Sequence, residues 1–162
     1  MADIVSTKKR SKMMAGIKSK NTKPELVIRK ALHKIGYRYS LHNKSLHGNP
    51  DICLTKYRTV IFVNGCFWHA HENCHLYRLP KSKTEFWQKK LSGNKVRDKK
   101  NIDKLHNDDW RVIVIWECSL KGRHKLDLNA LTKEIDCWIQ GDSYWLEIRG
   151  SKSTNQESHY PK

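Results

Sequence analysis

Long hydrophobic runs and acidic side chains are both scarce in this sequence. No apolar run is long enough to cross a bilayer, and the first residues lack the hydrophobic segment of a signal peptide. We therefore expect a cytoplasmic protein with no membrane partner. The chain has only 16 Asp and Glu against 32 Lys and Arg, which gives a formal net charge of +16. This imbalance predicts a polyanionic partner, most commonly nucleic acid.

The length and the cysteine content narrow the class further. A chain of 162 residues suits one domain with a single modest core. Its five cysteines are an odd number, and in a reducing compartment they favour metal ligands or buried thiols over disulfides. Cys53 and Cys137 lie in apolar segments and are predicted to be core thiols.

Composition divides the chain into three regions. Residues 1–21 are polar and basic, and they predict an arm or short helix that becomes ordered on a partner. Residues 22–141 carry the apolar patterns of a folded domain. Residues 142–162 are predicted to form a polar, disordered tail.

The folded region predicts an alternation of helices and strands. Two sequences of the capping-box type, beginning at Thr22 and Ser82, each predict the start of a helix. Further apolar patterns predict strands near 37–41, 51–54, 57–63 and 110–117, and a closing helix near 128–139. This order predicts an α/β fold in which helices flank a mixed central sheet.

Candidate metal ligands and aromatic rings are packed into a short stretch after the apolar run 60–63. Because a second apolar run ends just before another cysteine, two strand ends can bring four ligands around one tetrahedral zinc ion. The expected ligands are Cys66, His71, Cys74 and Cys118. His69 or His75 can take the place of His71, and a loop of unliganded side chains is the simpler alternative. Four protein ligands leave no position for a reacting water, so such a zinc would be structural.

Three polar residues each allow more than one interpretation. Asp51 follows a proline at the start of a buried strand, where a carboxylate is either a turn residue or a ligand for Mg²⁺. His69 is either a proton acceptor for an attacking water or a spare zinc ligand. Glu25 is most simply the cap of its helix.

Aromatic and basic side chains offer a surface for nucleic acid. Phe67, Trp68 and Trp87 can stack on bases or wedge between them. Phe86 is predicted to lie in the core. The basic residues of the long second helix either hold phosphates or form only a solvated face. They include Lys89, Lys90, Lys95 and Arg97.

Ordered blocks of residues between positions 10 and 138 resemble the very-short-patch-repair (Vsr) mismatch endonucleases. The matching blocks are 19–25, 48–51, 60–69, 84–87 and 110–118. The resemblance implies a fold related to the PD-(D/E)XK restriction nucleases, with an active site that departs from their consensus. It implies Mg²⁺-dependent nicking of one DNA strand on the 5′ side of the T in a T:G mismatch, which arises when 5-methylcytosine deaminates. The implied partners are double-stranded DNA with that mismatch and other mismatch-repair proteins, and we expect a monomer.

Residue roles follow from the same resemblance. Asp51 matches the Mg²⁺-binding carboxylate, assisted by the backbone carbonyl of Val63, and His69 matches the catalytic histidine. Glu25 matches an accessory acidic position. Some members have Thr-His where this chain has Val63-Asn64; Asn64 can orient a phosphate or water but carries no proton, which shifts acid–base work to His69. The zinc ligands and the aromatic wedge are also matched, by Cys66, His71, Cys74 and Cys118 and by Phe67, Trp68 and Trp87.

Two other functions would use the same features. A zinc-stabilised DNA-binding protein without nuclease activity would need the charge, the zinc and the rings, but neither Asp51 nor His69. A restriction-type nuclease would cut both strands of DNA that has no mismatch. A T:G duplex incubated with Mg²⁺ separates nicking from binding alone, and a fully paired duplex separates the two kinds of nuclease.

Overall fold

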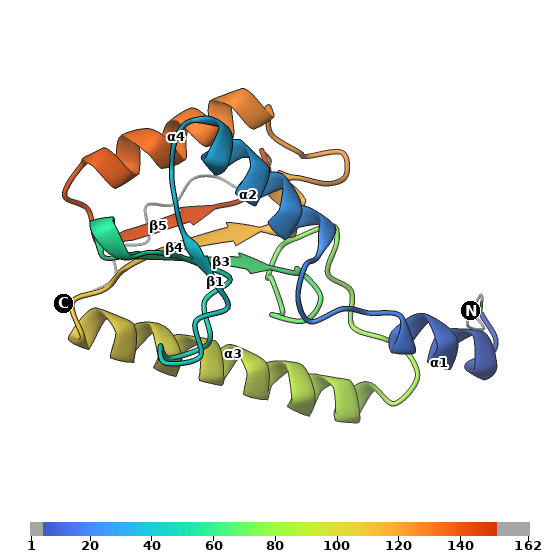
Figure 1. Cartoon of the computed structure of the whole chain (residues 1–162). Helices are drawn as coiled ribbons and strands as arrows, with labels where there is room; N and C mark the ends of the chain where they lie inside the picture. The colour runs from blue at the N-terminus through green and yellow to red at the C-terminus, as the bar shows by residue number, and fades with distance from the viewer. Residues whose placement is uncertain (1–4, 152–162) are drawn as a thin grey trace.

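The computed structural model describes residues 5–151, which form a five-stranded sheet with the strand order β1-β2-β3-β4-β5 (Figure 1). β1, β2 and β3 are antiparallel neighbours, whereas β3, β4 and β5 run parallel. The strands are β1 (Ser40–Leu41), β2 (Ile52–Leu54), β3 (Thr59–Asn64), β4 (Arg111–Trp116) and β5 (Trp145–Ile148). The mixed α/β architecture expected from the sequence is confirmed.

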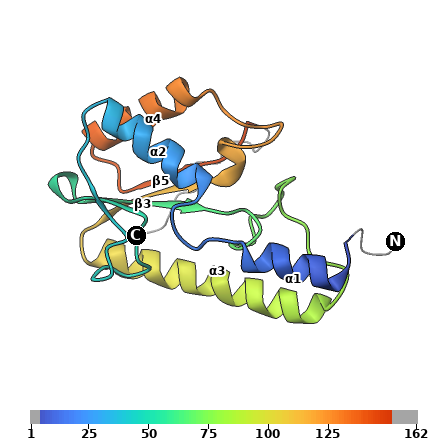
Figure 2. The same cartoon turned by 45° about the vertical axis from the view of Figure 1, so that its right-hand side comes forward.

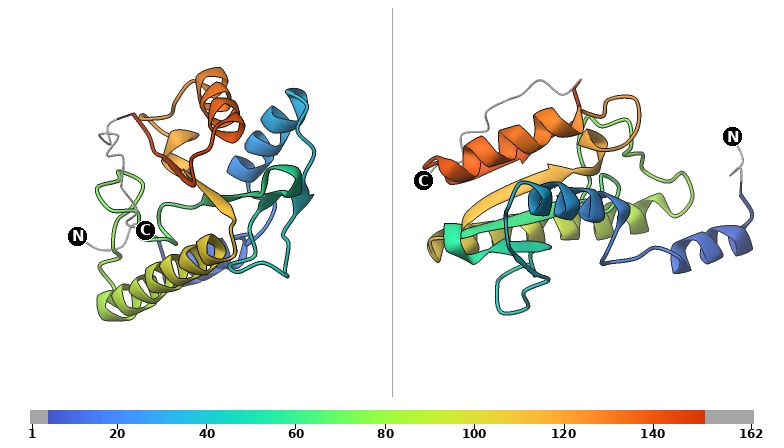
Figure 3. Two further views of the ribbon diagram at one scale, coloured as in Figure 1. Left: turned by 90° about the vertical axis from the view of Figure 1, so that its left-hand side faces the viewer. Right: turned by 45° about the horizontal axis from the view of Figure 1, so that its top comes forward.

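Residues 5–151 also form four α-helices. They are α1 (Thr7–Ala15), α2 (Lys23–Lys34), α3 (Thr84–Asn107) and α4 (Leu128–Gln140), and the short 3₁₀ turns η1 (Thr55–Tyr57) and η2 (Glu117–Ser119) follow β2 and β4. α2 and α4 cover one face of the sheet and α3 covers the other (Figures 1 and 3). α1 lies near the start of α3 (Figure 2), and Nη1 of Arg10 donates to Oγ of Ser82 at 3.0 Å.

A hydrophobic core forms on each face of the sheet, because successive residues of a strand point to opposite faces. On one face Ile61 belongs to a cluster with Ile28 of α2 and Ile135 of α4. On the other face Val112 belongs to a cluster with Leu105 of α3. The central strands β3 and β4 are therefore buried on both sides, and their ends are held in fixed positions.

Only one of the two expected capping boxes forms. The hydroxyl of Thr22 accepts the N–H of Glu25 at 3.4 Å, which confirms the first. The second is wrong: α3 begins at Thr84 rather than directly after Ser82. Lys83 precedes α3 with a left-handed φ of 52° and makes no side-chain capping bond. That backbone turn separates Ser82 from the first turn of the helix.

The expected polar tail is partly wrong. Residues 145–148 form β5, which pairs in parallel with β4 from Val112–Trp145 to Ile115–Ile148. The partner strand lies some thirty residues earlier in the chain, so the local composition does not reveal the pairing. The folded domain therefore continues past residue 141. The rest of the expected tail, residues 152–162, lies outside the described residues.

Several smaller expectations have mixed outcomes. Phe86 is 57% exposed rather than in the core, because α3 buries its other side through Leu91 and Leu105. Cys53 is buried as expected, whereas Cys137 is exposed. Residues 7–15 of the basic arm form α1, and residues 1–4 lie outside the described part. Among residues 5–151 there is no helix with both the length and the apolar character needed to span a membrane.

Candidate active site and metal centre

The topology of the sheet brings three distant segments to one end of its strands. Because β3 and β4 are parallel, the segments after Asn64 and after Trp116 leave the sheet at the same end. β2 is antiparallel to β3, so Asp51, just before β2, lies at that end as well. The carboxylate of Asp51, the loop of residues 65–75 (the Cys/His loop) and the segment that carries Cys118 therefore meet there.

The four expected zinc ligands form a compact cluster. Their ligand atoms all lie within 4.8 Å of one another: Cys66, His71, Cys74 and Cys118. Nδ1 of His71 lies 3.3 Å from Sγ of Cys66 and 3.6 Å from Sγ of Cys118. Of the three candidate histidines the structure brings His71, and neither His69 nor His75, to the thiols. Three sulfurs and one imidazole at this spacing fit a closed tetrahedral zinc site.

The chain that follows β5 completes the surroundings of this cluster. The N–H of Gly150 donates to Sγ of Cys118 at 3.3 Å, and Nε of Arg149 lies 2.5 Å from Nε2 of His71. A hydrogen bond from the Cys66 thiol is the largest of the effects that lower the pKa of Cys118, and the same contact raises the pKa of Cys66. The cluster is thus arranged to hold at least one thiolate, the form that binds metal.

Asp51 has a desolvated carboxylate at the start of β2. Its Oδ2 accepts the backbone N–H of Val63 at 2.8 Å. Burial raises the pKa of Asp51 to about 7, although the hydrogen bond from Val63 acts in the opposite direction. A cation beside a desolvated carboxylate favours its ionised form. The position therefore fits a divalent ion, for which carboxylate and carbonyl oxygens are the usual ligands.

Glu25 belongs to a polar network that reaches Asp51, and it is only 2% exposed. Its Oε2 accepts the N–H of Asn21 at 3.0 Å and Nη2 of Arg29 at 2.6 Å. The same Nη2 lies 2.9 Å from Nε2 of His42. Burial lowers the pKa of His42, and its Nδ1 lies 3.8 Å from Oδ1 of Asp51. Glu25 is therefore both the helix cap expected from the sequence and a neighbour of the candidate ion site.

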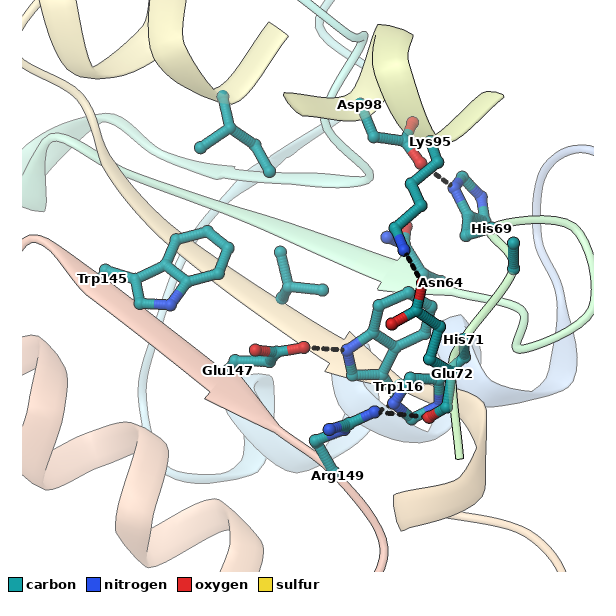
Figure 4. A pocket seen from close by; sticks show the side chains of 13 residues that line it. Asn64, His69, His71, Glu72, Lys95, Asp98, Trp116, Trp145, Glu147 and Arg149 are labelled. Atoms are coloured by element: carbon teal, nitrogen blue, oxygen red, sulfur yellow. Dashed lines mark hydrogen bonds and ion pairs between the residues drawn. The ribbon is translucent and has the colours of Figure 1, made fainter. Parts of the chain in front are cut away.

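His69 has a fixed carboxylate partner on α3. Its Nδ1 lies 2.5 Å from Oδ2 of Asp98, beside a cavity of about 250 Å³ (Figure 4). A carboxylate at Nδ1 keeps the ring proton on that nitrogen and leaves Nε2 able to accept another. Asn64, at the end of β3, lines the same cavity and is largely buried. His69 is thus arranged as a proton acceptor rather than as a fifth member of the thiol cluster.

The expected wedge residues form a single aromatic cluster. Phe67 lies edge-to-face with Trp68 at 5.2 Å and with Trp87 at 5.5 Å between ring centroids. Nδ2 of Asn94 donates to the carbonyl of Trp68 at 2.9 Å and ties the loop to α3. Nζ of Lys90 lies over the two indole rings, 5.6 Å from Trp68 and 5.5 Å from Trp87. The half-buried rings and the ammonium group therefore form one surface.

The basic residues expected to hold phosphates are all exposed on α3. Lys95 forms an ion pair with Glu72, which lies between the ligands His71 and Cys74 in the sequence. Arg97 hydrogen-bonds within the helix at 3.2 Å. Lys89 lies two residues after Trp87 in the sequence and directly before Lys90. The helix face next to the aromatic rings is thus positive, as contact with a phosphate backbone requires.

Several residues of these sites were not found from the sequence. Asp98 lies in a run of lysines and arginines, where an isolated acid looks like a solvated ion-pair partner. His42 stands alone in a turn, and Arg149 falls in the stretch expected to be a tail. Each becomes a candidate only through the spatial neighbours that the fold supplies, so no local motif could have indicated them.

Comparison with known proteins gives the class. The chain is 41% identical over 148 residues to the DNA mismatch endonuclease Vsr of Escherichia coli, covering 91% of this chain and 94% of that protein. It is 47% identical over 137 residues to the type II nicking enzyme V.NmeAIP of Neisseria meningitidis, covering 83% and 97%. It is 44% identical over 135 residues to the type II nicking enzyme V.XorIIP of Xanthomonas oryzae pv. oryzae, covering 83% and 95%. The mixed sheet, the site at its end and these relatives together define an endonuclease.

The family follows from the same comparisons. The family model for DNA mismatch endonuclease Vsr matches residues 2–76, which include Asp51 and the Cys/His loop. The chain belongs to the Vsr family of DNA mismatch endonucleases. The resemblance carried by the ordered sequence blocks is therefore confirmed.

Proposed function

We propose that this protein nicks one DNA strand on the 5′ side of the T in a T:G mismatch and so starts very short patch repair. Its family and its relatives support a strand-specific mismatch endonuclease. The observation that carries the chemistry is the convergence of Asp51 and the His69–Asp98 pair at one end of the sheet. A protein that only binds DNA has no need of a histidine oriented in this way.

The proposed ion site is built from oxygen ligands. Asp51 and the backbone carbonyl of Val63 would hold Mg²⁺, and Glu25 is the accessory acid behind them. When bound, this ion would supply Lewis-acid stabilisation of the charge that develops on the scissile phosphate. Burial keeps water away from Asp51 and strengthens its attraction for a cation.

The proton transfer belongs to His69. Its Nε2 accepts a proton from the attacking water, while Asp98 at Nδ1 fixes the ring orientation and stabilises the imidazolium that results. Asn64 is placed beside the same cavity and can donate a hydrogen bond to a phosphate oxygen or to the water. The division of labour is therefore one proton acceptor, one orienting carboxylate and one neutral hydrogen-bond donor.

Recognition of the mismatch would have a separate structural basis. Zinc held by the thiol cluster would brace the loop that carries Phe67 and Trp68, and α3 adds Trp87 to the same cluster. Inserting rings between base pairs costs about a few kcal/mol for each unstacked step. A T:G wobble pair stacks less well than a Watson–Crick pair, so the rings enter at lower cost there. Lys89, Lys90, Lys95 and Arg97 would hold the backbone beside the rings.

The test compares a T:G duplex with the same duplex carrying T:A, each incubated with Mg²⁺ and the zinc-loaded protein. We expect a nick only in the T strand of the mismatched duplex. The Asp51→Ala variant is expected to shift the mismatched duplex in a gel without cutting it. Retained cutting would contradict the role of Asp51, and cutting of both strands of the paired duplex would indicate a restriction-type nuclease.

The five-stranded mixed sheet with helices on both faces is compatible with a fold related to the PD-(D/E)XK restriction nucleases. We also propose that the protein acts as a monomer in the cytoplasm, associated with the nucleoid through DNA, and that other mismatch-repair proteins complete the repair. Light scattering measures the mass of the protein in solution, with and without DNA. One protein chain in each sample is the result expected for a monomer.

A further inference from the structure

His42 is a partly buried neighbour of the proposed ion site, and no sequence motif indicates it. It follows β1 and has a left-handed φ of 47°, which is uncommon for a residue other than glycine. Its backbone N–H donates to the backbone carbonyl of Asp51 at 3.2 Å, so the turn after β1 is registered on the residue that carries the carboxylate. The fold therefore holds the imidazole beside Asp51 in a backbone conformation of the kind that concentrates at functional sites.

The two sides of the imidazole face different acids. Nδ1 lies 3.8 Å from Oδ1 of Asp51, and Nε2 lies 3.7 Å from Oε2 of Glu25. Both distances are too long for a hydrogen bond. The 3.8 Å between Nδ1 and Oδ1 is shorter than the sum of two metal–ligand bonds of about 2.1 Å each. One ion can therefore contact both atoms. Oδ2 of Asp51 is occupied by the N–H of Val63, which leaves Oδ1 as the oxygen that faces an ion.

We infer that His42 is a ligand, through Nδ1, of the divalent ion held by Asp51. The inference rests on the proposed function, because it concerns the same ion. A histidine bound to a metal through one nitrogen carries its proton on the other and usually donates it to a carboxylate. Glu25 stands on that side of the ring, so the three residues already have the order carboxylate, imidazole, ion site. This gives the accessory acid a defined role, which is to orient His42.

In this structure the guanidinium group of Arg29 contacts the side of His42 that faces Glu25. Its Nη2 donates to Oε2 of Glu25 and also contacts Nε2 of His42, so a positive group already lies between them. When Nδ1 binds an ion, Nε2 becomes a donor and can no longer accept from Arg29. Arg29 must then leave His42 while keeping Glu25 and Asn21, to which Nη1 donates at 2.7 Å. Ion binding is therefore coupled to a small movement of Arg29.

The imidazole has a consequence for the choice of ion. Oxygen ligands suit Mg²⁺, whereas an imidazole suits transition metals better. A site with His42 should therefore favour Mn²⁺ over Mg²⁺ more strongly than the same site without it.

The experiment measures ion binding directly, on zinc-loaded protein without DNA. Mn²⁺ affinity is obtained from the electron paramagnetic resonance of unbound Mn²⁺, and Mg²⁺ affinity from its competition. His42→Asn is the variant, because Asn tolerates the left-handed backbone. His47→Asn is the matched control, since His47 lies in the same loop but is paired with Asp108 at 3.5 Å. We expect His42→Asn to weaken Mn²⁺ binding by about tenfold or more and Mg²⁺ binding by less than about threefold, and the control to change neither.

A spectroscopic measurement makes the result independent of any loss of stability in the variant. The electron spin echo of Mn²⁺ bound to the unaltered protein should show coupling to a histidine nitrogen. The coupling should persist in His47→Asn and in His69→Asn, and disappear in His42→Asn. Bound Mn²⁺ without such coupling, or coupling that survives in His42→Asn, overturns the inference. Nicking of the T:G duplex by the unaltered protein in Mg²⁺ is scored separately, so the proposed function can stand or fall by itself.

Discussion

The contact between His69 and Asp98 decides at the residue scale which nitrogen of the imidazole receives a proton. Asp98→Asn keeps the size of the side chain but removes the charge that holds the proton on Nδ1. Because an oriented general base contributes about 10²–10⁴ to rate, we expect kcat for nicking to fall at least about tenfold. KM for the duplex should change little, since Asp98 acts through His69, the proposed proton acceptor.

Asp103→Asn is the matched control for this prediction. Asp103 lies on the same helix and pairs with Lys99 at 2.9 Å on the surface. Its variant should nick at the unaltered rate. Equal loss of rate in both variants would mean that Asp98 only stabilises α3.

Tyr37 provides a prediction about stability and pH. Its hydroxyl donates to Oδ1 of Asp136 at 2.6 Å, and burial raises the pKa of Tyr37 to about 12. The folded-state pKa of Tyr37 is above the ordinary value of 10.0. The stability that the un-ionised phenol contributes is therefore complete below pH 10 and is lost as the pH rises towards 12. Between those values the unaltered protein should lose about 1 to 2 kcal/mol more than Tyr37→Phe.

Urea unfolding at pH 9, 10, 11 and 12 checks the prediction for Tyr37, because titrating lysines affect both proteins alike. Tyr144→Phe is the control, since Tyr144 is 53% exposed. A parallel decline for Tyr37→Phe and the unaltered protein would show that the phenol ionises without cost to the fold.

At the scale of elements, β5 connects the sheet to the thiol cluster. A Cβ at Gly150 would lie 2.8 Å from the carbonyl oxygen of Cys118 and 2.9 Å from that of His124, both of them backbone atoms. Gly150→Ala should therefore displace the segment after β5, cost about 1 to 3 kcal/mol and speed the release of zinc to a chelator. Gly93 in α3 has no atom within 4 Å of its Cβ position, so Gly93→Ala should instead stabilise by about 0.5 to 1 kcal/mol. Thermal unfolding measures the change in stability of Gly150→Ala and Gly93→Ala. A colour indicator for zinc measures the rate at which each variant releases the metal.

The proposed zinc ion would hold the shape of the loop between β3 and α3. Cys66 and His71 lie on either side of Phe67 and Trp68 in the sequence. Removal of zinc would therefore release the backbone that positions these two aromatic rings. We expect zinc-free protein to lose discrimination between T:G and T:A duplexes by about tenfold or more, at about 1.4 kcal/mol for each tenfold, while general DNA affinity changes less. Competition binding with both duplexes, before and after chelation and after zinc is restored, measures this. Unchanged discrimination in zinc-free protein would separate the cluster from recognition.

At the scale of the whole molecule, a formal charge of +16 makes DNA affinity sensitive to salt. Each phosphate contact contributes about −0.9 to the slope of log K against log salt concentration. Lys90→Gln, over the aromatic cluster, should reduce the magnitude of the slope by about 1. Lys133→Gln on α4, on the other face of the sheet, should leave it unaltered. Fluorescence anisotropy from 50 to 300 mM salt, roughly the range in which such slopes are measured, provides the test.

The sequence alone determined the class of the fold, the basic surface and the residue types of the site. Periodic apolar residues encode which segments are helices and strands, because burial on one face is a local property of the chain. The spacing within 66–74 indicated a metal set because three of the four ligands lie close together in the sequence. The capping box at Thr22 is also a local feature, since it needs only four residues.

The tertiary structure decided everything that depends on distant segments meeting. Only the parallel pairing of β4 with β5 shows that residues 145–148 belong to the sheet. Only the packing of α3 places Asp98 at Nδ1 of His69, and only the turn after β1 places His42 at Asp51. These contacts carry no periodicity and no fixed spacing, because they depend on where separate elements cross at the end of the sheet.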